Sequence, residues 1–323
     1  MGNEREMLTQ DTASLFQKAG FETSLCNIRA CYDIIARGKA ATFLIKAMPN
    51  VDAMTPDYVQ DLKTLCYYFK AHPLVIGIRT KAEELRTGVI HFRDDIPVIS
   101  IGTLEHIIID NEPPLVYADR GGFYVQIHGD LLRSIRENMG YSMAEFAKEM
   151  GVSRTTLYDY EHSKRGIDLE VAIRLEEILD TPLIKPLSIR KDISEREPAH
   201  PPEPRTPLER DVYELLGRIG LVVHPTKRTP FDAVVREQDE RPKLFMLTGI
   251  ANIDLRSAKR RIAVVHELAT LLEKDAVFVF STPVPKRSIS GVPIIQVDEI
   301  RCLADCDAML EVVKERTSDE EED

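Results

Sequence analysis

The sequence lacks any long apolar run, and its first ten residues contain no apolar run at all. The longest apolar stretches, Leu74–Ile78 and Ala276–Phe280, are as long as buried strands, whereas a helix that spans a bilayer needs about 20 apolar residues. The opening segment, Met1 to Gln10, is polar and has no apolar core of the kind that export signals carry. The sequence therefore predicts a soluble cytoplasmic protein with no membrane partner.

Cysteine is scarce, and its spacing excludes the common uses of this residue. The cysteines are Cys26, Cys31, Cys66, Cys302 and Cys306. An odd number in a chain this long does not suggest a disulfide framework. Neither close pair has the Cys-x-x-Cys spacing or the nearby histidine of a structural zinc site. We expect reduced thiols in a reducing cytoplasm, with no metal and no cofactor.

Positive charge is in deficit, with 42 Lys and Arg against 53 Asp and Glu and a net charge of −11. Part of the acidic excess lies in residues 316–323, which we expect to form a disordered, solvated tail. A chain of this charge does not look like a general nucleic-acid binder. Binding to DNA depends on local positive charge, however, so a motif must decide the question.

The remaining composition is that of a folded protein, and 323 residues predict two or three domains. Residues 1–120 alternate between strand-like and helix-like patterns, which is typical of an α/β domain. Within them we expect helices over Thr12–Lys18 and Asp57–Lys70, and strands over Tyr32–Ala36, Thr42–Lys46, Leu74–Ile78 and Pro97–Ile101.

Residues 208–315 repeat the pattern of the first segment about 200 residues later. Lys18–Phe21 aligns with Arg218–Leu221, Tyr32–Arg37 with Phe231–Arg236, and Leu44–Asp52 with Met246–Asp254. The order of these matches predicts a duplicated α/β domain. Residues 191–207 contain five prolines and should form a semi-rigid linker.

The segment between them, residues 121–190, is predicted to be helical throughout. Ser142 and Glu145 have the spacing of a capping box, which begins a helix over Met143–Met150. Gly151 can end that helix in a left-handed conformation. Ser153 can then cap a second helix over Arg154–Glu161, and a further helix, capped by Asp168, is expected over Leu169–Leu179. Two short helices joined by a glycine turn cross steeply, so that the second can enter the major groove of DNA.

On these residues the segment, from roughly Gly129 to Leu183, resembles the Cro/C1 (XRE-type) helix-turn-helix. Such repressors often carry glutamine at the first position of both helices, where this chain has Met143 and Arg154. The base preference therefore does not transfer. The entire chain also resembles a group of HTH-type transcriptional regulators known mainly from archaea. The resemblance implies DNA binding and transcription regulation.

The expected interface combines base-reading and phosphate-binding side chains. Arg154 can bond guanine bidentately, and Thr155 can contact a base, a phosphate or a thymine methyl group. Lys164 and Arg165 are placed for phosphates. We expect a homodimer on double-stranded DNA, with an effector unknown. The candidate DNA-binding residues are Ser142, Met143, Ser153, Arg154, Thr155, Thr156, Tyr158, Lys164 and Arg165.

The flanking segments resemble the PD-(D/E)xK nucleases, in which two acids and a lysine support metal-assisted hydrolysis. Asp33 matches the first acid and Lys46 the lysine, but Leu44 stands where the second acid should be. In the repeat Asp232 remains, beside Met246 and Thr248. Because a divalent cation requires oxygen ligands, we expect no catalytic residue and no enzyme activity.

The predicted fold is thus a central Cro/C1-type helix-turn-helix bundle flanked by two α/β, nuclease-like domains. Two other functions stay open. One is a metal-dependent nuclease that the helix-turn-helix guides to its target, and the other is a scaffold or dimerisation protein without a DNA role. Asp33, Lys46 and Asp52 can equally be structural, as caps of turns or as solvated groups at a sheet edge.

Overall fold

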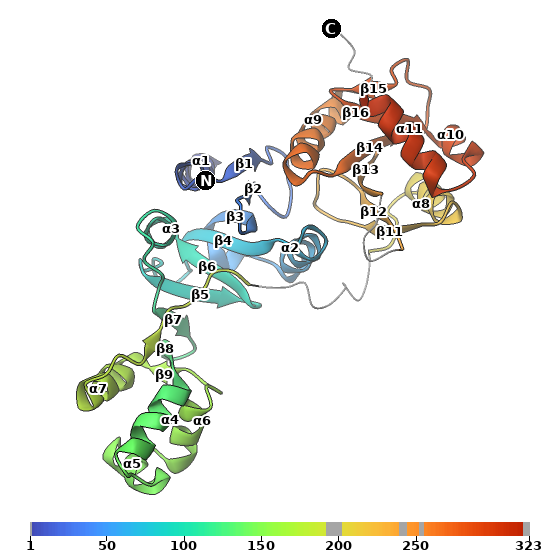
Figure 1. Ribbon diagram of the computed structural model, residues 1–323. Coiled ribbons are helices and arrows are strands. Elements are labelled where there is room, and N and C mark those ends of the chain that lie inside the picture. The colour runs from blue at the N-terminus through green and yellow to red at the C-terminus, as the bar shows by residue number, and fades with distance from the viewer. Residues whose placement is uncertain (1, 192–201, 239–243, 252–254, 319–323) are drawn as a thin grey trace. The chain divides into compact units, whose positions relative to one another are not determined.

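The computed structural model describes residues 2–191, 202–238, 244–251 and 255–318 (Figure 1). These residues divide into two compact units, and each unit joins segments that lie apart in the sequence. Unit 1 comprises Met1–Ala19, Met48–Ala53 and Leu74–Lys191, and unit 2 comprises Gly20–Ala47, Met54–Pro73 and Asp192–Asp323. Most of the expected linker and most of the expected tail lie outside the described residues.

Unit 1 contains an α/β part in which two helices accompany a sheet of mixed direction. Strand β4 pairs in parallel with β6, β6 with β5 in antiparallel, and β5 with β7 in parallel. The helices α1 and α3 pack against each other. The elements are α1 (Gly2–Lys18), the 3-10 turn η1 (Val51–Ala53), β4 (His72–Arg79), β5 (Val89–Arg93), β6 (Ile96–Ser100), α3 (Ile101–Ile108) and β7 (Val116–Asp119).

The rest of unit 1 is a helix bundle joined to the same sheet. Strand β8 pairs with β7 on one side and with the short strands β9 and β10. Figure 1 shows the four helices gathered beyond β8. The elements are β8 (Gly122–Ile127), α4 (Gly129–Asn138), α5 (Met143–Glu149), α6 (Arg154–Glu161), β9 (Ile167–Asp168), α7 (Leu169–Leu179) and β10 (Ile184–Lys185).

The bundle core is made by one apolar face from each helix together with the inner face of β8. Leu132 of α4, Phe146 of α5, Leu157 of α6 and Leu175 of α7 are all buried there. Val125 and Ile127 supply the strand's contribution. Because short helices are marginal alone, this shared core is what stabilises them.

Unit 2 contains an antiparallel β1-β2-β3 arrangement and a complete six-stranded sheet in the order β11-β12-β13-β14-β16-β15. Buried aliphatic residues of α8, α10, α11 and the second sheet form one core. The elements are β1 (Glu22–Leu25), β2 (Ile34–Arg37), β3 (Thr42–Asn50), α2 (Pro56–Phe69), α8 (Pro207–Arg218), β11 (Leu221–Pro225), β12 (Ala233–Glu237), β13 (Phe245–Ala251), α9 (Leu255–Leu272), β14 (Asp275–Phe280), β15 (Ser288–Ile289), β16 (Val292–Gln296), α10 (Val297–Cys302) and α11 (Cys306–Ser318).

Several sequence-based expectations are corrected. Residues 121–190 are not helical throughout, because Gly122–Ile127 is strand β8. That run is rich in aromatic and β-branched residues and follows a tight turn at Gly121, where φ is +94°. The first helix begins at Gly2, ten residues before the expected start, and residues 316–318 end α11 instead of beginning a tail.

The order of elements in the first α/β segment recurs in the last. A helix, three strands, a helix, three strands and a helix run from α1 to α3 and again from α8 to α10. The pairings recur as well. In the first segment β1, β2 and β3 pair in antiparallel, as β11, β12 and β13 do in the last. Strand β4 pairs in parallel with β6, as β14 does with β16. Strand β5 pairs in antiparallel with β6, as β15 does with β16.

Candidate nucleic-acid interface

The turn between α5 and α6 is built from local capping interactions that the sequence predicts. The Ser142 hydroxyl accepts a hydrogen bond from the Glu145 N–H at 3.3 Å, and the Glu145 carboxylate accepts one from the Ser142 N–H at 2.9 Å. These bonds also hold the pKa of Glu145 below its usual value. Gly151 follows with φ +66°, a left-handed conformation that lets the chain reverse at once. The predicted capping box and turn are therefore confirmed.

Helix α6 begins with a second cap, and its first residues face solvent. The Ser153 hydroxyl accepts a hydrogen bond from the Thr156 N–H at 3.0 Å and lies 2.8 Å from the Thr156 hydroxyl. Arg154 and Thr155, the next residues, are both exposed. Among the described residues, no ion pair ties the Arg154 guanidinium to the protein. This side chain is therefore available to a ligand.

An exposed aromatic stack continues the outer face of α6. The Tyr158 ring is 42% exposed and stacks on His162, with ring centroids 3.9 Å apart. The Lys164 ammonium lies 4.7 Å from the centre of the same ring. Arg165 lies over Tyr160 at 5.7 Å. Stacking and cation–π contacts position two cations beside the helix. His162 is not among the residues predicted from the sequence, although it stands four residues after Tyr158 and so lies on the same face of the helix.

The inner face of α6 is fixed by a buried ion pair with α4. Arg136 Nε donates to Glu161 Oε1 at 2.6 Å, and Arg136 Nη2 donates to Oε2 at 3.0 Å. The approach of the helices depends on Gly129, because a Cβ atom there would lie 2.5 Å from the Glu161 carbonyl oxygen. The C-terminal end of α6 is therefore anchored to α4.

Seven of the nine predicted DNA-binding residues are exposed on the surface of the bundle. Met143 differs from the others, because its side chain is half-buried and packs against the bundle core. Thr156 is also half-buried. The exposed members of the predicted set are Ser142, Ser153, Arg154, Thr155, Tyr158, Lys164 and Arg165.

The nuclease-like position in unit 2 is occupied by a closed ion pair. Lys46 Nζ lies 3.3 Å from Asp33 Oδ1 and donates to the Ala30 carbonyl at 2.7 Å. Asp33 Oδ2 accepts the Ala47 N–H at 2.8 Å. Asp33 is 2% exposed and Lys46 6%, while Leu44 is fully buried. Both carboxylate oxygens are engaged by the protein, and no second acid stands at position 44.

Asp52, the other acid that the sequence singles out near Lys46, lies in unit 1 and stabilises local structure. Its carboxylate accepts the Lys81 N–H at 2.8 Å and pairs with Arg93 at 2.9 Å. These two interactions, the backbone hydrogen bond first, lower the pKa of Asp52.

In the second α/β segment, the residues that correspond to Leu44 and Lys46 lie one position later than the sequence alignment predicts. The Asp33 N–H donates to the Ile45 carbonyl, and the Asp232 N–H donates to the Thr248 carbonyl, each at 2.8 Å. Thr248 thus corresponds to Ile45, one residue away from the expected match with Lys46. The counterparts of Leu44 and Lys46 are therefore Leu247 and Gly249. A Cβ atom at Gly249 would lie 2.4 Å from the Phe278 ring, so no lysine fits there.

The Asp232 carboxylate pairs with two arginines. Arg205 Nη2 donates to Asp232 Oδ1 at 2.6 Å, and Arg261 Nη2 donates to Oδ2 at 2.5 Å. The Ile250 N–H also donates to Oδ2, at 2.7 Å. The Asp33 and Asp232 sites thus share a buried aspartate that accepts a backbone N–H. They differ in the cation, which is Lys46 at Asp33 and a pair of arginines at Asp232.

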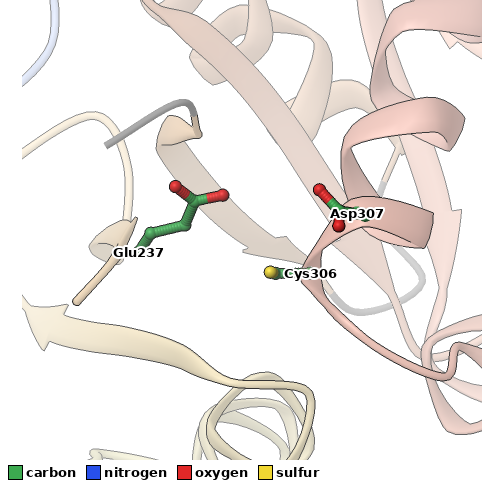
Figure 2. Close-up of side chains that lie close together, drawn as sticks. All are labelled: Glu237, Cys306 and Asp307. Atoms are coloured by element: carbon green, nitrogen blue, oxygen red, sulfur yellow. The ribbon is translucent and has the colours of Figure 1, made fainter. Parts of the chain in front are cut away.

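One group of side chains in unit 2 has metal-ligand chemistry. Figure 2 shows Glu237, which ends β12, opposite Cys306 and Asp307 at the start of α11. Their ligand atoms lie within 4.8 Å of one another. The group offers three ligands where a structural zinc site has four, and Asp307 is exposed. Proximity alone does not identify a metal site.

Three of the other cysteines are packing residues, and Cys302 is exposed. Cys26, Cys31 and Cys66 are buried free thiols, and burial raises the pKa of the Cys26 and Cys66 thiols. Such thiols are poor nucleophiles and poor ligands. In the part of the chain that the structure describes, no helix combines the length and the apolar character needed to cross a membrane.

Comparison with known proteins identifies two domain types. Residues 5–114 match the PD-(D/E)XK superfamily domain, and residues 132–185 match a helix-turn-helix domain of the Cro/C1 type. No solved structure matches the chain.

Relatives match along almost the entire length. A protein of Pyrococcus furiosus is 39% identical, covering 98% of this chain and 99% of its own. One from Thermococcus gammatolerans is 36% identical over 96% of each chain, and one from Haloquadratum walsbyi is 34% identical over 97% and 98%. Each carries the name "Putative HTH-type transcriptional regulatory protein". The chain combines a PD-(D/E)XK domain with a Cro/C1-type helix-turn-helix, and it belongs to this family of archaeal HTH-type transcriptional regulatory proteins.

Proposed function

We propose that the protein is a sequence-specific regulator that reads duplex DNA with the exposed face of α6. The observation that carries this proposal is the placement of Arg154 and Thr155 in the first turn of a helix whose opposite end is anchored by Glu161. Arginine at this position of a recognition helix can bond guanine bidentately in the major groove. Lys164 and Arg165 lie beyond the helix, where they can contact phosphates.

Selection from random duplex DNA tests this function. The full chain is incubated with a random pool at two salt concentrations, and bound DNA is sequenced after repeated rounds. An enriched motif that Arg154→Ala no longer enriches supports the proposal. Binding without enrichment would contradict sequence-specific reading, and the absence of salt-dependent binding would favour the scaffold function instead.

The protein acts as a homodimer in this proposal, so that two α6 helices reach half-sites about one helical turn apart. We assign the contact with the second copy to the face of α7 that carries Ile173, an apolar side chain that is 45% exposed. Sedimentation equilibrium of the wild type and of Ile173→Glu tests this assignment, since a dimer that persists in the variant would contradict it.

We also propose that the chain contains a duplicated α/β domain, with residues 1–120 and 208–315 as copies and residues 121–190 as the DNA-binding domain between them. The recurring order of elements and pairings supports this arrangement. So does the repeated hydrogen-bond pattern, in which Asp33 accepts the Ala47 N–H and Asp232 accepts the Ile250 N–H.

The alternative function is a metal-dependent nuclease, which the match of residues 5–114 to the PD-(D/E)XK domain favours. We propose that both copies are inactive, because Asp33 is already paired with Lys46 and Leu44 supplies no ligand. Incubation of plasmid and branched DNA with Mg²⁺ or Mn²⁺ separates the two functions. Cleavage that Asp33→Ala abolishes would establish the nuclease.

A further inference from the structure

Unit 2 contains a cavity of about 650 Å³ beside Asp232, and its lining is unusually rich in arginine. Its size falls in the range of small-molecule binding sites, about 300–1,000 Å³. The charged groups that line it are Arg29, Arg205, Arg260, Arg261, Glu209 and Asp232. Apolar side chains, including Ile28, Leu208 and Ile250, form other parts of its wall.

Four of these charged groups neutralise one another. Arg205 pairs with Glu209 at 3.2 Å and with Asp232 at 2.6 Å. Arg261 pairs with the other oxygen of Asp232. The negative charges of Glu209 and Asp232 are therefore neutralised within the protein. Their repulsion of an anion in the cavity is reduced accordingly.

The remaining two arginines have no carboxylate partner among the described residues. Arg29 and Arg260 are both exposed at the cavity. Arg260 donates to the Asn27 carbonyl oxygen at 2.8 Å, a contact that positions the guanidinium but does not neutralise it. The cavity therefore carries two positive charges in excess.

At the corresponding place in the first copy of the α/β domain, beside α2, the positive charge is neutralised. There Arg228 pairs with Asp57 and Asp61 of α2, each at 3.0 Å, and lies over the Tyr58 ring. Arg228 precedes Asp232 by four residues, as Arg29 precedes Asp33. Of the two corresponding arginines, Arg228 and Arg29, Arg228 is thus neutralised by two aspartates.

Helix α9, the counterpart of α2, carries no aspartate. The buried positions of the two helices fix their correspondence: Val59 matches Ile262, Leu62 matches Val265 and Leu65 matches Leu268. In this register Asp57 corresponds to Arg260 and Asp61 to Val264. Two arginines, Arg29 and Arg260, therefore line the cavity where the first copy has the Arg228 ion-pair cluster.

We propose that this cavity binds a phosphate-bearing small molecule, with Arg29 and Arg260 as its principal ligands and Arg261 at the inner wall. Guanidinium groups bind phosphate oxygens through paired hydrogen bonds, and they do so most strongly where no competing carboxylate is close. The apolar wall can receive the less polar part of a nucleotide-sized molecule. The proposal is independent of DNA reading by α6.

Isothermal titration calorimetry of the full chain, with inorganic pyrophosphate and with adenosine triphosphate as probes, tests the site. We expect saturable binding that Arg29→Ala and Arg260→Ala each weaken by about tenfold or more. Lys259→Ala is the matched control, because Lys259 is the exposed cation next to Arg260 and does not line the cavity. It should bind like the wild type.

Three outcomes would overturn the proposal: no binding of either probe, equal binding by all variants, or phosphate recognition confined to the DNA backbone. The last is recognised when Arg29→Ala weakens binding to a duplex while neither small probe binds. Arg154→Ala should bind pyrophosphate normally, so failure of the DNA-reading function can be told from failure of this site. Thermal melting of each variant checks that it is folded.

Discussion

Arg136 of α4 and Glu161 of α6 form a two-point ion pair inside the helix bundle, with the side chains 9% and 0% exposed. The Arg136 guanidinium also donates to the Tyr141 carbonyl at 3.1 Å, which ties the pair to the segment before α5. One buried arginine thus connects three parts of the helix-turn-helix.

Removal of one member of this pair should destabilise the bundle strongly. Glu161→Ala leaves the buried Arg136 guanidinium with only the half-exposed Glu137 carboxylate, 3.4 Å away, as a counter-charge. Loss of the buried partner should cost up to about 3–5 kcal/mol. Urea denaturation followed by circular dichroism measures the change. Arg133→Ala is the control, because the Arg133–Glu137 pair is about half exposed and should contribute no more than about 1 kcal/mol. Equal effects of the two substitutions would contradict the assigned role.

Two helical glycines should respond in opposite directions to substitution by alanine. Gly129→Ala places a methyl group 2.5 Å from the Glu161 carbonyl and must displace α4 from α6. Gly217 of α8 has no atom within 4 Å of the added group, so Gly217→Ala should raise stability by about 0.5–1 kcal/mol. Melting temperatures of both variants test the contrast. A Gly129→Ala protein as stable as the wild type would show that the approach of the helices is looser than described.

The Asp33–Lys46 pair should behave as a structural unit. Lys46→Met removes the cation beside the buried Asp33 carboxylate and should cost about 3–5 kcal/mol, whereas the double variant Asp33→Asn/Lys46→Met should recover most of that loss. The comparison is made by urea denaturation of the single and double variants. If the double variant is no more stable than Lys46→Met, the pair is not the reason for the burial of these side chains.

His91 should make stability depend on pH. Burial first, and then the nearby Arg93 charge, lowers the pKa of His91, while Glu83 acts in the opposite direction. A histidine with a lowered folded pKa binds its proton more readily in the unfolded chain. Stability is therefore complete above the unfolded value of about 6.5 and falls as the pH decreases below it. Melting temperatures between about pH 7.5 and pH 5.5 should fall less for His91→Gln than for the wild type, and parallel curves would contradict this cause.

The sequence predicts those parts of the molecule whose interactions are local. Ser142, Glu145 and Ser153 each cap a helix within three residues, so the limits of α6 were predicted correctly. The Leu169–Leu179 helix was predicted correctly too, together with its Asp168 cap. Such signals survive because the backbone groups they satisfy are close in the chain.

Interactions between distant residues could not be predicted. Strand β8 exists because it pairs with β7 and with short strands that follow 40 and more residues later, and these pairings cannot be seen in its local sequence. The Arg136–Glu161 pair joins residues 25 apart. The match of Gly249 with Lys46 depends on a hydrogen-bond register, and a one-residue shift is invisible in a weak alignment.

The most direct test of the central claim compares binding of the wild type and of Arg154→Ala to a selected duplex and to a shuffled one at fixed salt. If Arg154 reads a base, the variant loses about 1–3 kcal/mol on the selected duplex and little on the shuffled one. Lys148→Ala, which removes an exposed cation of α5, should leave this discrimination intact. Equal losses on both duplexes would mean that Arg154 contacts only phosphate, and unchanged binding to both would show that α6 does not read DNA.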